Sequence, residues 1–160
     1  MIKILIVEDE DIIRNGFIHT FDWLAMDCSI AGAASDGREG LEMIRTLHPD
    51  LVFVDIMMPV MNGLEMLEAA GENPHFKTII LTSYNEFEFA KQAIHLRVFD
   101  YLLKPVDGAL LRDLIDRVKK EIDQERVFHQ VMEAARDKKD LELMDMTIYV
   151  EKDKGCNPYV

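Results

Sequence analysis

The sequence predicts an α/β fold, a doubly wound five-stranded parallel sheet with five helices, the last of them extended. Short apolar runs alternate with amphipathic stretches over residues 1–122. Some runs, such as LVFV at 51–54, are apolar on both faces, which is typical of parallel strands covered on two sides. The 160 residues, 49% of them apolar, suffice for one domain with a core and an appendage.

Five runs are predicted strands, because most of them are rich in β-branched or aromatic residues. They cover Ile2–Val7, Ser29–Ala34, Leu51–Asp55, Thr78–Thr82 and Val98–Leu103. Since a helical pattern separates each strand from the next, the connections are expected to be right-handed crossovers within one sheet. We expect the flavodoxin-like strand order 2-1-3-4-5.

The stretches between the strands carry apolar residues at three- and four-residue spacings, which predicts helices. Four of these helices cover Asp11–Leu24, Gly40–Leu47, Leu64–Ala70 and Glu86–Leu96. Asp107 can cap the fifth. Neither Gly nor Pro occurs from Ala109 to Lys154, so this last helix can run past the domain to about Arg136.

We expect residues 1–122 to form the domain and residues 123–160 to form a helical extension and interdomain linker, loosely ordered from about Lys138. An apolar stripe on the extension either packs on its own domain or forms a dimer seam. Charged and polar residues interrupt its heptad pattern, so the pattern does not decide between the two. The stripe contains Val127, Phe128, Val131 and Met132, and the interruptions are Glu121, Glu125 and His129.

The charge of the chain limits its partners. The formal net charge is −12, and residues 1–125 hold 23 acidic against 12 basic residues. Such a surface repels phosphate backbones, so this part is a poor candidate for DNA contact. Cys28 and Cys156 match no zinc or redox spacing and are interpreted as free thiols in a reducing compartment. The opening MIKILIVEDE is too short to span a membrane and lacks a cleavage site, so we expect a cytoplasmic protein without membrane association.

Charged and hydroxyl side chains follow the predicted strands at their carboxyl ends, where open parallel sheets bind ligands. If the first and third strands are neighbours, three carboxylates converge in one pocket, which favours a hard divalent cation such as Mg²⁺. We assign Asp9, Asp55 and the main-chain carbonyl of Met57 as direct ligands, with Glu8 acting through water. Lys104 neutralises Asp55 further. The alternative is that the acidic residues only favour the start of the next helix, which we prefer for Glu10 and Asp11.

The segments ILIVEDE, LVFVDIMMPVMNG, IILTSYNE and DYLLKPVD together resemble the receiver domain of bacterial two-component response regulators. The resemblance covers about residues 1–122. It implies that Asp55 accepts a phosphoryl group from the phosphohistidine of a sensor histidine kinase or from acetyl phosphate. It further implies that Thr82 and Lys104 engage the phosphoryl oxygens. Tyr101 is then expected to be the switch aromatic, and the Lys104–Pro105 bond to be cis.

Finer features are similar to one subfamily, whose receivers precede an AraC-type helix-turn-helix domain. These features are FDWLAMDC, DYLLKPVD and the final GCNPYV. The resemblance implies a homodimer when phosphorylated, with DNA bound only through a C-terminal output domain absent from this chain. Arg97 departs from the family pattern, which usually has Gly there, and a left-handed conformation would cost it on the order of 1 kcal/mol.

Three alternatives stay open at this stage. A stand-alone receiver would signal through protein contacts alone. An aspartyl-phosphate phosphatase generally needs a second acid two residues after the nucleophile, where this chain has Met57. A flavodoxin-like cofactor binder is disfavoured, because the acidic loop EDEDIIRNG after the first strand would repel a phosphate.

Overall fold

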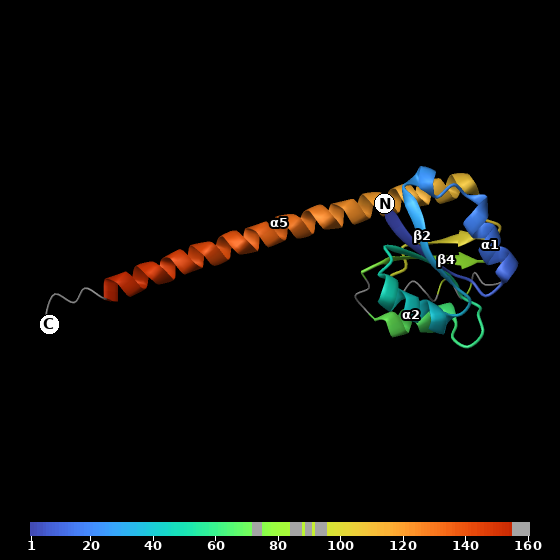
Figure 1. Cartoon of the computed structure of the whole chain (residues 1–160), viewed down its shortest axis with the longest axis horizontal. Coiled ribbons are helices and arrows are strands. Elements are labelled where there is room, and N and C mark those ends of the chain that lie inside the picture. Colours follow the sequence, from blue (N-terminus) through green and yellow to red (C-terminus); the bar gives the residue numbers. More distant parts are fainter. Residues whose placement is uncertain (72–74, 84–87, 89–90, 92–95, 155–160) are drawn as a thin grey trace. The chain divides into compact units, whose positions relative to one another are not determined.

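A five-stranded parallel sheet forms the centre of the domain, with the strand order β2-β1-β3-β4-β5 that the sequence predicts. The computed structural model describes residues 1–71, 75–83, 88, 91 and 96–154. Figure 1 shows the strands running side by side between helices. Their bounds are Ile2–Val7 for β1, Cys28–Ala34 for β2, Leu51–Asp55 for β3, Lys77–Thr82 for β4 and Asp100–Leu103 for β5.

The helices in the described part of the chain cover Asp11–Thr20 (α1), Gly37–Leu47 (α2), Gly63–Ala70 (α3) and Gly108–Lys154 (α5), with a 3₁₀ turn, η1, at Leu24–Met26. Of these, α2, α3 and α5 begin at a residue whose side chain caps the helix, whereas Glu10 before α1 makes no such bond. The Asp36 side chain accepts from the amide of Glu39, and Asn62 forms a capping box with Glu65. Asp107 Oδ1 accepts from the amide of Ala109 at 2.8 Å, which confirms the predicted cap.

One predicted helix ends earlier than expected, and another lies largely outside the described residues. Helix α1 ends at Thr20 rather than at Leu24, because the chain turns at Asp22, whose carboxylate accepts from the amide of Ala25. The predicted helix at Glu86–Leu96 lies largely outside the described residues; Glu88 and Lys91 are helical.

The sheet has an apolar core on each face. Helices α2 and α3 cover one face, where Ile44 and Met66 pack into a cluster with Val7 and Val54. On the opposite face, Phe17 of α1 contacts the ring of Phe53 edge-on, with ring centroids 5.1 Å apart. Four buried residues of α5 complete this second layer: Leu111, Leu114, Ile115 and Val118. Burial on both faces explains why β3 is apolar throughout its length before Asp55.

Residues Met1–Lys119 form one compact unit, and a second unit begins at Lys120. Helix α5 continues through Lys154, beyond the end expected at about Arg136, and the loosely ordered tail from about Lys138 stays a prediction. The absence of Gly and Pro from this stretch permits that length. None of the helices in the described ranges combines the length and apolar character that a bilayer crossing requires.

Two glycines provide a matched test of how tightly the sheet edge is packed. A Cβ atom at Gly63 would overlap the main-chain carbonyl oxygen of Asp55, whereas one at Gly16 in the middle of α1 would meet no atom of the described residues within 4 Å. We predict that Gly63→Ala lowers the free energy of unfolding by on the order of 2 kcal/mol, because the start of α3 must move away from β3. Gly16→Ala should raise it by about 0.5–1 kcal/mol through helix propensity. Urea denaturation of the two variants measures both values, and a shift of the same sign in both would contradict the packing.

Candidate functional site

Three carboxyl groups meet at the carboxyl-terminal edge of the sheet. Glu8 and Asp9 follow β1, and Asp55 ends the neighbouring strand β3. One ligand oxygen from each of the three lies within 4.8 Å of the other two. Glu8 is fully buried and Asp55 is 3% exposed. The structure therefore confirms the prediction that these three carboxyl groups lie close together.

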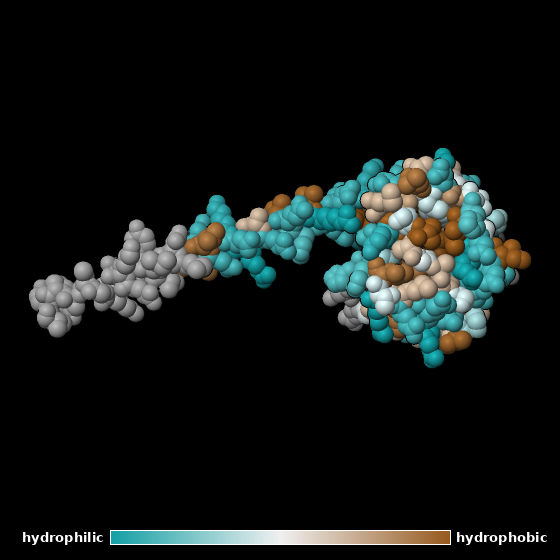
Figure 2. All heavy atoms as spheres, in the orientation of Figure 1, coloured by the Kyte–Doolittle hydropathy of each residue, from teal (hydrophilic) through white to brown (hydrophobic). Residues whose placement is uncertain are grey.

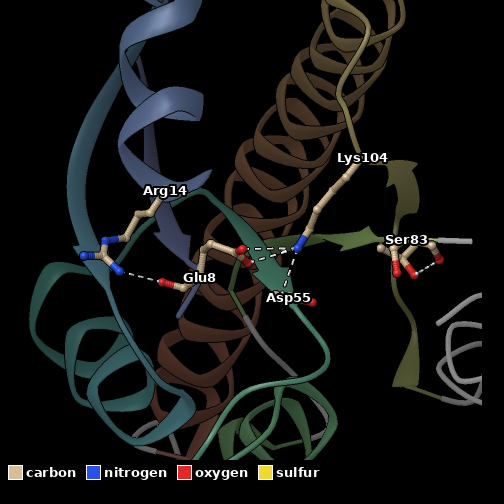
Figure 3. A network of polar contacts seen from close by, with 6 residues as sticks. Glu8, Arg14, Asp55, Ser83 and Lys104 are labelled. Atoms are coloured by element: carbon tan, nitrogen blue, oxygen red, sulfur yellow. Dashed lines mark hydrogen bonds and ion pairs between the residues drawn. The ribbon is translucent and has the colours of Figure 1, made fainter. Parts of the chain in front are cut away.

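Lys104 supplies the cation for this cluster. Its Nζ donates to Asp55 Oδ2 at 3.0 Å and to both carboxylate oxygens of Glu8 at 3.2 Å (Figure 3). The backbone places it there, because the Lys104 amide donates to the carbonyl of Thr82 at 2.8 Å just past the β4–β5 pairing. The Lys104–Pro105 bond is cis, as expected. Buried charges of this kind are stable only when they are paired and hydrogen-bonded.

The cluster shifts the acid–base properties of its members. Burial raises the pKa of Glu8 to about 8, and the neighbouring Asp55 carboxylate adds to this, while Lys104 opposes it. Burial lowers the pKa of Lys104, but its contacts with Asp55 and Glu8 outweigh burial and leave that pKa above its ordinary value. One ammonium group thus compensates the three carboxyl groups incompletely, and the site favours a further positive charge.

One carboxylate oxygen of Asp55 indicates where a further positive charge could bind. Asp55 Oδ1 is buried and has no hydrogen-bond partner in the described part of the protein, whereas Oδ2 is bonded to Lys104. A buried carboxylate oxygen without a partner costs free energy unless a ligand engages it. An all-oxygen set from two or three carboxylates matches the preference of Mg²⁺. The donor set therefore fits this ion.

The remaining predicted residues lie on or next to β3, β4 and β5 and differ in their contacts. Thr82 is buried at the end of β4, and its hydroxyl donates to the carbonyl of Ser83 at 3.1 Å. Tyr101 on β5 is 42% exposed. Met57 lies in the loop after β3 with an exposed side chain, and the role of its carbonyl stays a prediction. Arg97 has a φ of 55°, so it adopts the left-handed conformation considered above for this position, where the family usually has Gly.

Sequence reasoning missed Arg14, which joins the site from α1. Its Nη1 donates to the main-chain carbonyl of Glu8 at 2.7 Å (Figure 3). The signal available in the sequence was weak: Arg14 is the first basic residue after the acidic run Glu8–Asp11.

A pocket of about 450 Å³ opens beside Glu8 and Lys104. Arg14 also lines it, as do apolar side chains of α1 and of the segment after β5, among them Ile13, Phe17, Pro105 and Val106. The pocket therefore lies on the α1 side of the sheet, next to the Glu8 and Lys104 side chains.

Comparison with known proteins agrees with the fold. The family model for the response regulator receiver domain matches residues 4–119. The transcriptional regulatory protein HptR of Staphylococcus aureus is 40% identical over 118 residues, which are 74% of this chain and 46% of HptR. The uncharacterized transcriptional regulatory protein YesN of Bacillus subtilis is 34% identical over 128 residues, 79% of this chain and 35% of YesN.

Solved structures show the same similarity. The receiver domain of AraT, a response regulator from Geobacillus stearothermophilus, superposes with a TM-score of 0.73 at 41% identity. That match covers 78% of this chain and 98% of the AraT domain. A two-component transcriptional regulator AraC from Clostridium phytofermentans superposes with a TM-score of 0.70 at 28% identity, covering 79% and 98%.

These similarities concern one domain, since the chain spans about half the length of the first curated relatives that it matches. Receiver domains are phosphoacceptor signalling domains that interact with sensor histidine kinases and bind Mg²⁺ at an acidic pocket. By the match over residues 4–119 and the relatives at 40% identity, the chain belongs to the response regulator receiver domain family.

Proposed function

We propose that Asp55 is the phosphoacceptor of this domain and that its phosphorylation depends on Mg²⁺ and a sensor histidine kinase. The observation that carries the proposal is the Asp55 Oδ1 oxygen, which is buried beside Glu8, Asp9 and Lys104 and has no hydrogen-bond partner among the residues that the structure describes. A carboxylate held in this way is desolvated and oriented before the donor arrives. The proposed exchange takes place in the cytoplasm.

In the proposed reaction a carboxylate oxygen of Asp55 attacks the phosphorus of a phosphohistidine. The new P–O bond forms as the P–N bond breaks, and the electron pair of the P–N bond returns to the imidazole nitrogen. Lys104, already 3.0 Å from Asp55 Oδ2, would neutralise charge on the transferred group. Thr82 would give up its contact with the Ser83 carbonyl and donate its hydroxyl to a phosphoryl oxygen. Glu8, Asp9, Asp55 and the Met57 carbonyl would hold Mg²⁺, which supplies further neutralisation of the phosphoryl oxygens.

The signal would then reach the surface through β4 and β5. Movement of Thr82 toward the phosphoryl group would free space beside β5, into which the exposed Tyr101 could turn. Such a switch needs only a few kcal/mol of difference between its two states.

The relatives support a transcriptional output. HptR and YesN are named as transcriptional regulatory proteins and extend well beyond the matched region. We propose that residues 1–122 act as the receiver, that 123–160 are its helical extension and linker, and that an AraC-type domain beyond them binds DNA.

Exposed apolar residues on α5 support self-association of the phosphorylated protein. Val127, Phe128, Val131 and Met132 are all more than half exposed. Figure 2 shows apolar side chains (brown) gathered along this helix among charged ones (teal). Burial of such side chains against a second copy would contribute roughly 25 cal/mol per Å² of apolar area.

Phosphotransfer with acetyl phosphate and Mg²⁺ tests the acceptor. We predict that Asp55→Asn abolishes incorporation, because the amide is a poor nucleophile and lacks the negative charge that pairs with Lys104. Asp113→Asn, at an exposed site on α5 paired with Arg117, serves as the matched control and should be labelled like the wild type. Intact-protein mass spectrometry measures the added phosphoryl group, and equal labelling of Asp55→Asn would refute the assignment.

The pH dependence of Mg²⁺ binding tests the charge balance. The pKa of Glu8 is about 8 in the folded protein against 4.5 in the unfolded chain, so the metal-free stability should fall as pH rises between these values. Binding of Mg²⁺ displaces the Glu8 proton, so affinity should rise up to about tenfold per pH unit from pH 6 toward 8. Calorimetric titrations measure both affinity and proton release. In Glu8→Gln the slope should disappear, and a pH-independent wild type would contradict the predicted coupling.

Sedimentation velocity tests the dimer seam. With beryllofluoride and Mg²⁺, which mimic an aspartyl phosphate, the wild type should shift toward a dimer. Phe128→Glu should reduce the association at least tenfold, because it places a charge in the seam. Ile12→Glu, a similar change at an exposed site on α1, is the control. Unchanged association of Phe128→Glu would exclude this surface.

A further inference from the structure

Arg14 connects the first helix to the acidic loop of the site. Its Nη1 donates to the carbonyl oxygen of Glu8 at 2.7 Å, and its Nη2 pairs with Asp11 in the first turn of α1. The side chain is 16% exposed. Figure 3 shows the guanidinium lying beside the Glu8 main chain, away from the Lys104 ammonium.

The contacted oxygen belongs to the peptide group that joins Glu8 to Asp9. That group is planar, so fixing its oxygen restricts the orientation of both flanking Cα atoms. The carboxylates of Glu8 and Asp9, two of the three in the cluster, extend from these atoms. The planar fork of an arginine can hold this carbonyl with one nitrogen and Asp11 with the other. The guanidinium thereby ties the β1–α1 loop to the helix that follows it.

Two possible roles of Arg14 predict effects of opposite sign on a bound cation. If only its charge matters, the guanidinium repels a divalent ion and its removal strengthens binding. If it orients the Glu8–Asp9 peptide, its removal lets the carboxylates reorient and weakens binding. The direct, part-buried hydrogen bond to a carbonyl adjacent to two carboxylates favours orientation.

We propose that Arg14 is a positioning residue that sets the Mg²⁺ affinity of the domain by holding the Glu8–Asp9 peptide. The inference rests on the proposed function insofar as Mg²⁺ is the ion of the site. It adds a determinant of affinity that lies outside the carboxylates and Lys104.

The test is a Mg²⁺ titration of the full chain followed by amide chemical shifts, which reports binding without any phosphotransfer. Arg14→Met keeps an unbranched side chain but removes the donors and the charge. It should weaken Mg²⁺ binding by about threefold to tenfold, the effect of losing one ordinary hydrogen bond. Arg117→Met removes an arginine that pairs with Asp100 and Asp113, and should change the affinity less than twofold.

Arg14→Lys separates the two roles further, because it keeps the charge but loses the two-pronged donor geometry. Positioning predicts an affinity between those of the wild type and Arg14→Met, whereas a pure charge effect predicts the wild-type value. This variant decides the matter even if Arg14→Met does not fold. Unchanged or tighter binding in the Arg14 variants would overturn the inference alone, whereas a wild type that binds no Mg²⁺ would overturn the proposed function with it.

Discussion

The ion pairs of Lys104 with Glu8 and Asp55 are the interaction on which the rest of the site depends. Two buried carboxylates side by side are unstable without a cation, and Lys104 contacts both at 3.0–3.2 Å. The three residues come from the ends of β1, β3 and β5, and the observed strand order places these ends near one another at one edge of the sheet. The fold thus concentrates negative charge at one edge of the sheet, and Lys104 neutralises only part of that charge.

The negative charge that Lys104 does not neutralise is the basis of the proposed function. Lys104 bonds Asp55 Oδ2 and leaves Oδ1 without a hydrogen-bond partner within the described part of the chain, and Asp9 adds a third carboxyl group to the cluster. Under the proposed function, such a site would gain free energy from a divalent cation, and would gain again when a phosphoryl group on Asp55 brings new acceptor oxygens to Lys104 and Thr82. The backbone around the site is correspondingly fixed: Gly63 packs against the Asp55 carbonyl, and Arg14 holds the Glu8 carbonyl. In the proposed switch, the parts that move are the Thr82 hydroxyl on β4 and the Tyr101 ring on β5.

Much of the fold and the position of the site could be predicted from the sequence. Parallel strands buried on both faces have a clear apolar signature, and their carboxyl ends lie at the same edge of the sheet. Asp55 and Lys104 were predicted to meet for that reason. The contact of Lys104 with both oxygens of Glu8 was not predicted, since strand ends give proximity but not side-chain direction. Arg14 was missed because it contacts a main-chain carbonyl, for which no residue pattern exists. The end of α1 was misplaced because a side-chain turn at Asp22 outweighs helical spacing.

The most direct measurement of the central claim is the position of a bound ion in a crystal grown with Mn²⁺, which prefers the same oxygen ligands as Mg²⁺ and scatters anomalously. We predict one strong anomalous peak within coordination distance of the Asp9 and Asp55 carboxylates, with Lys104 still in contact with Asp55. An occupied peak elsewhere, or none at saturating Mn²⁺, would contradict the view that this buried charge cluster is built to receive a divalent cation.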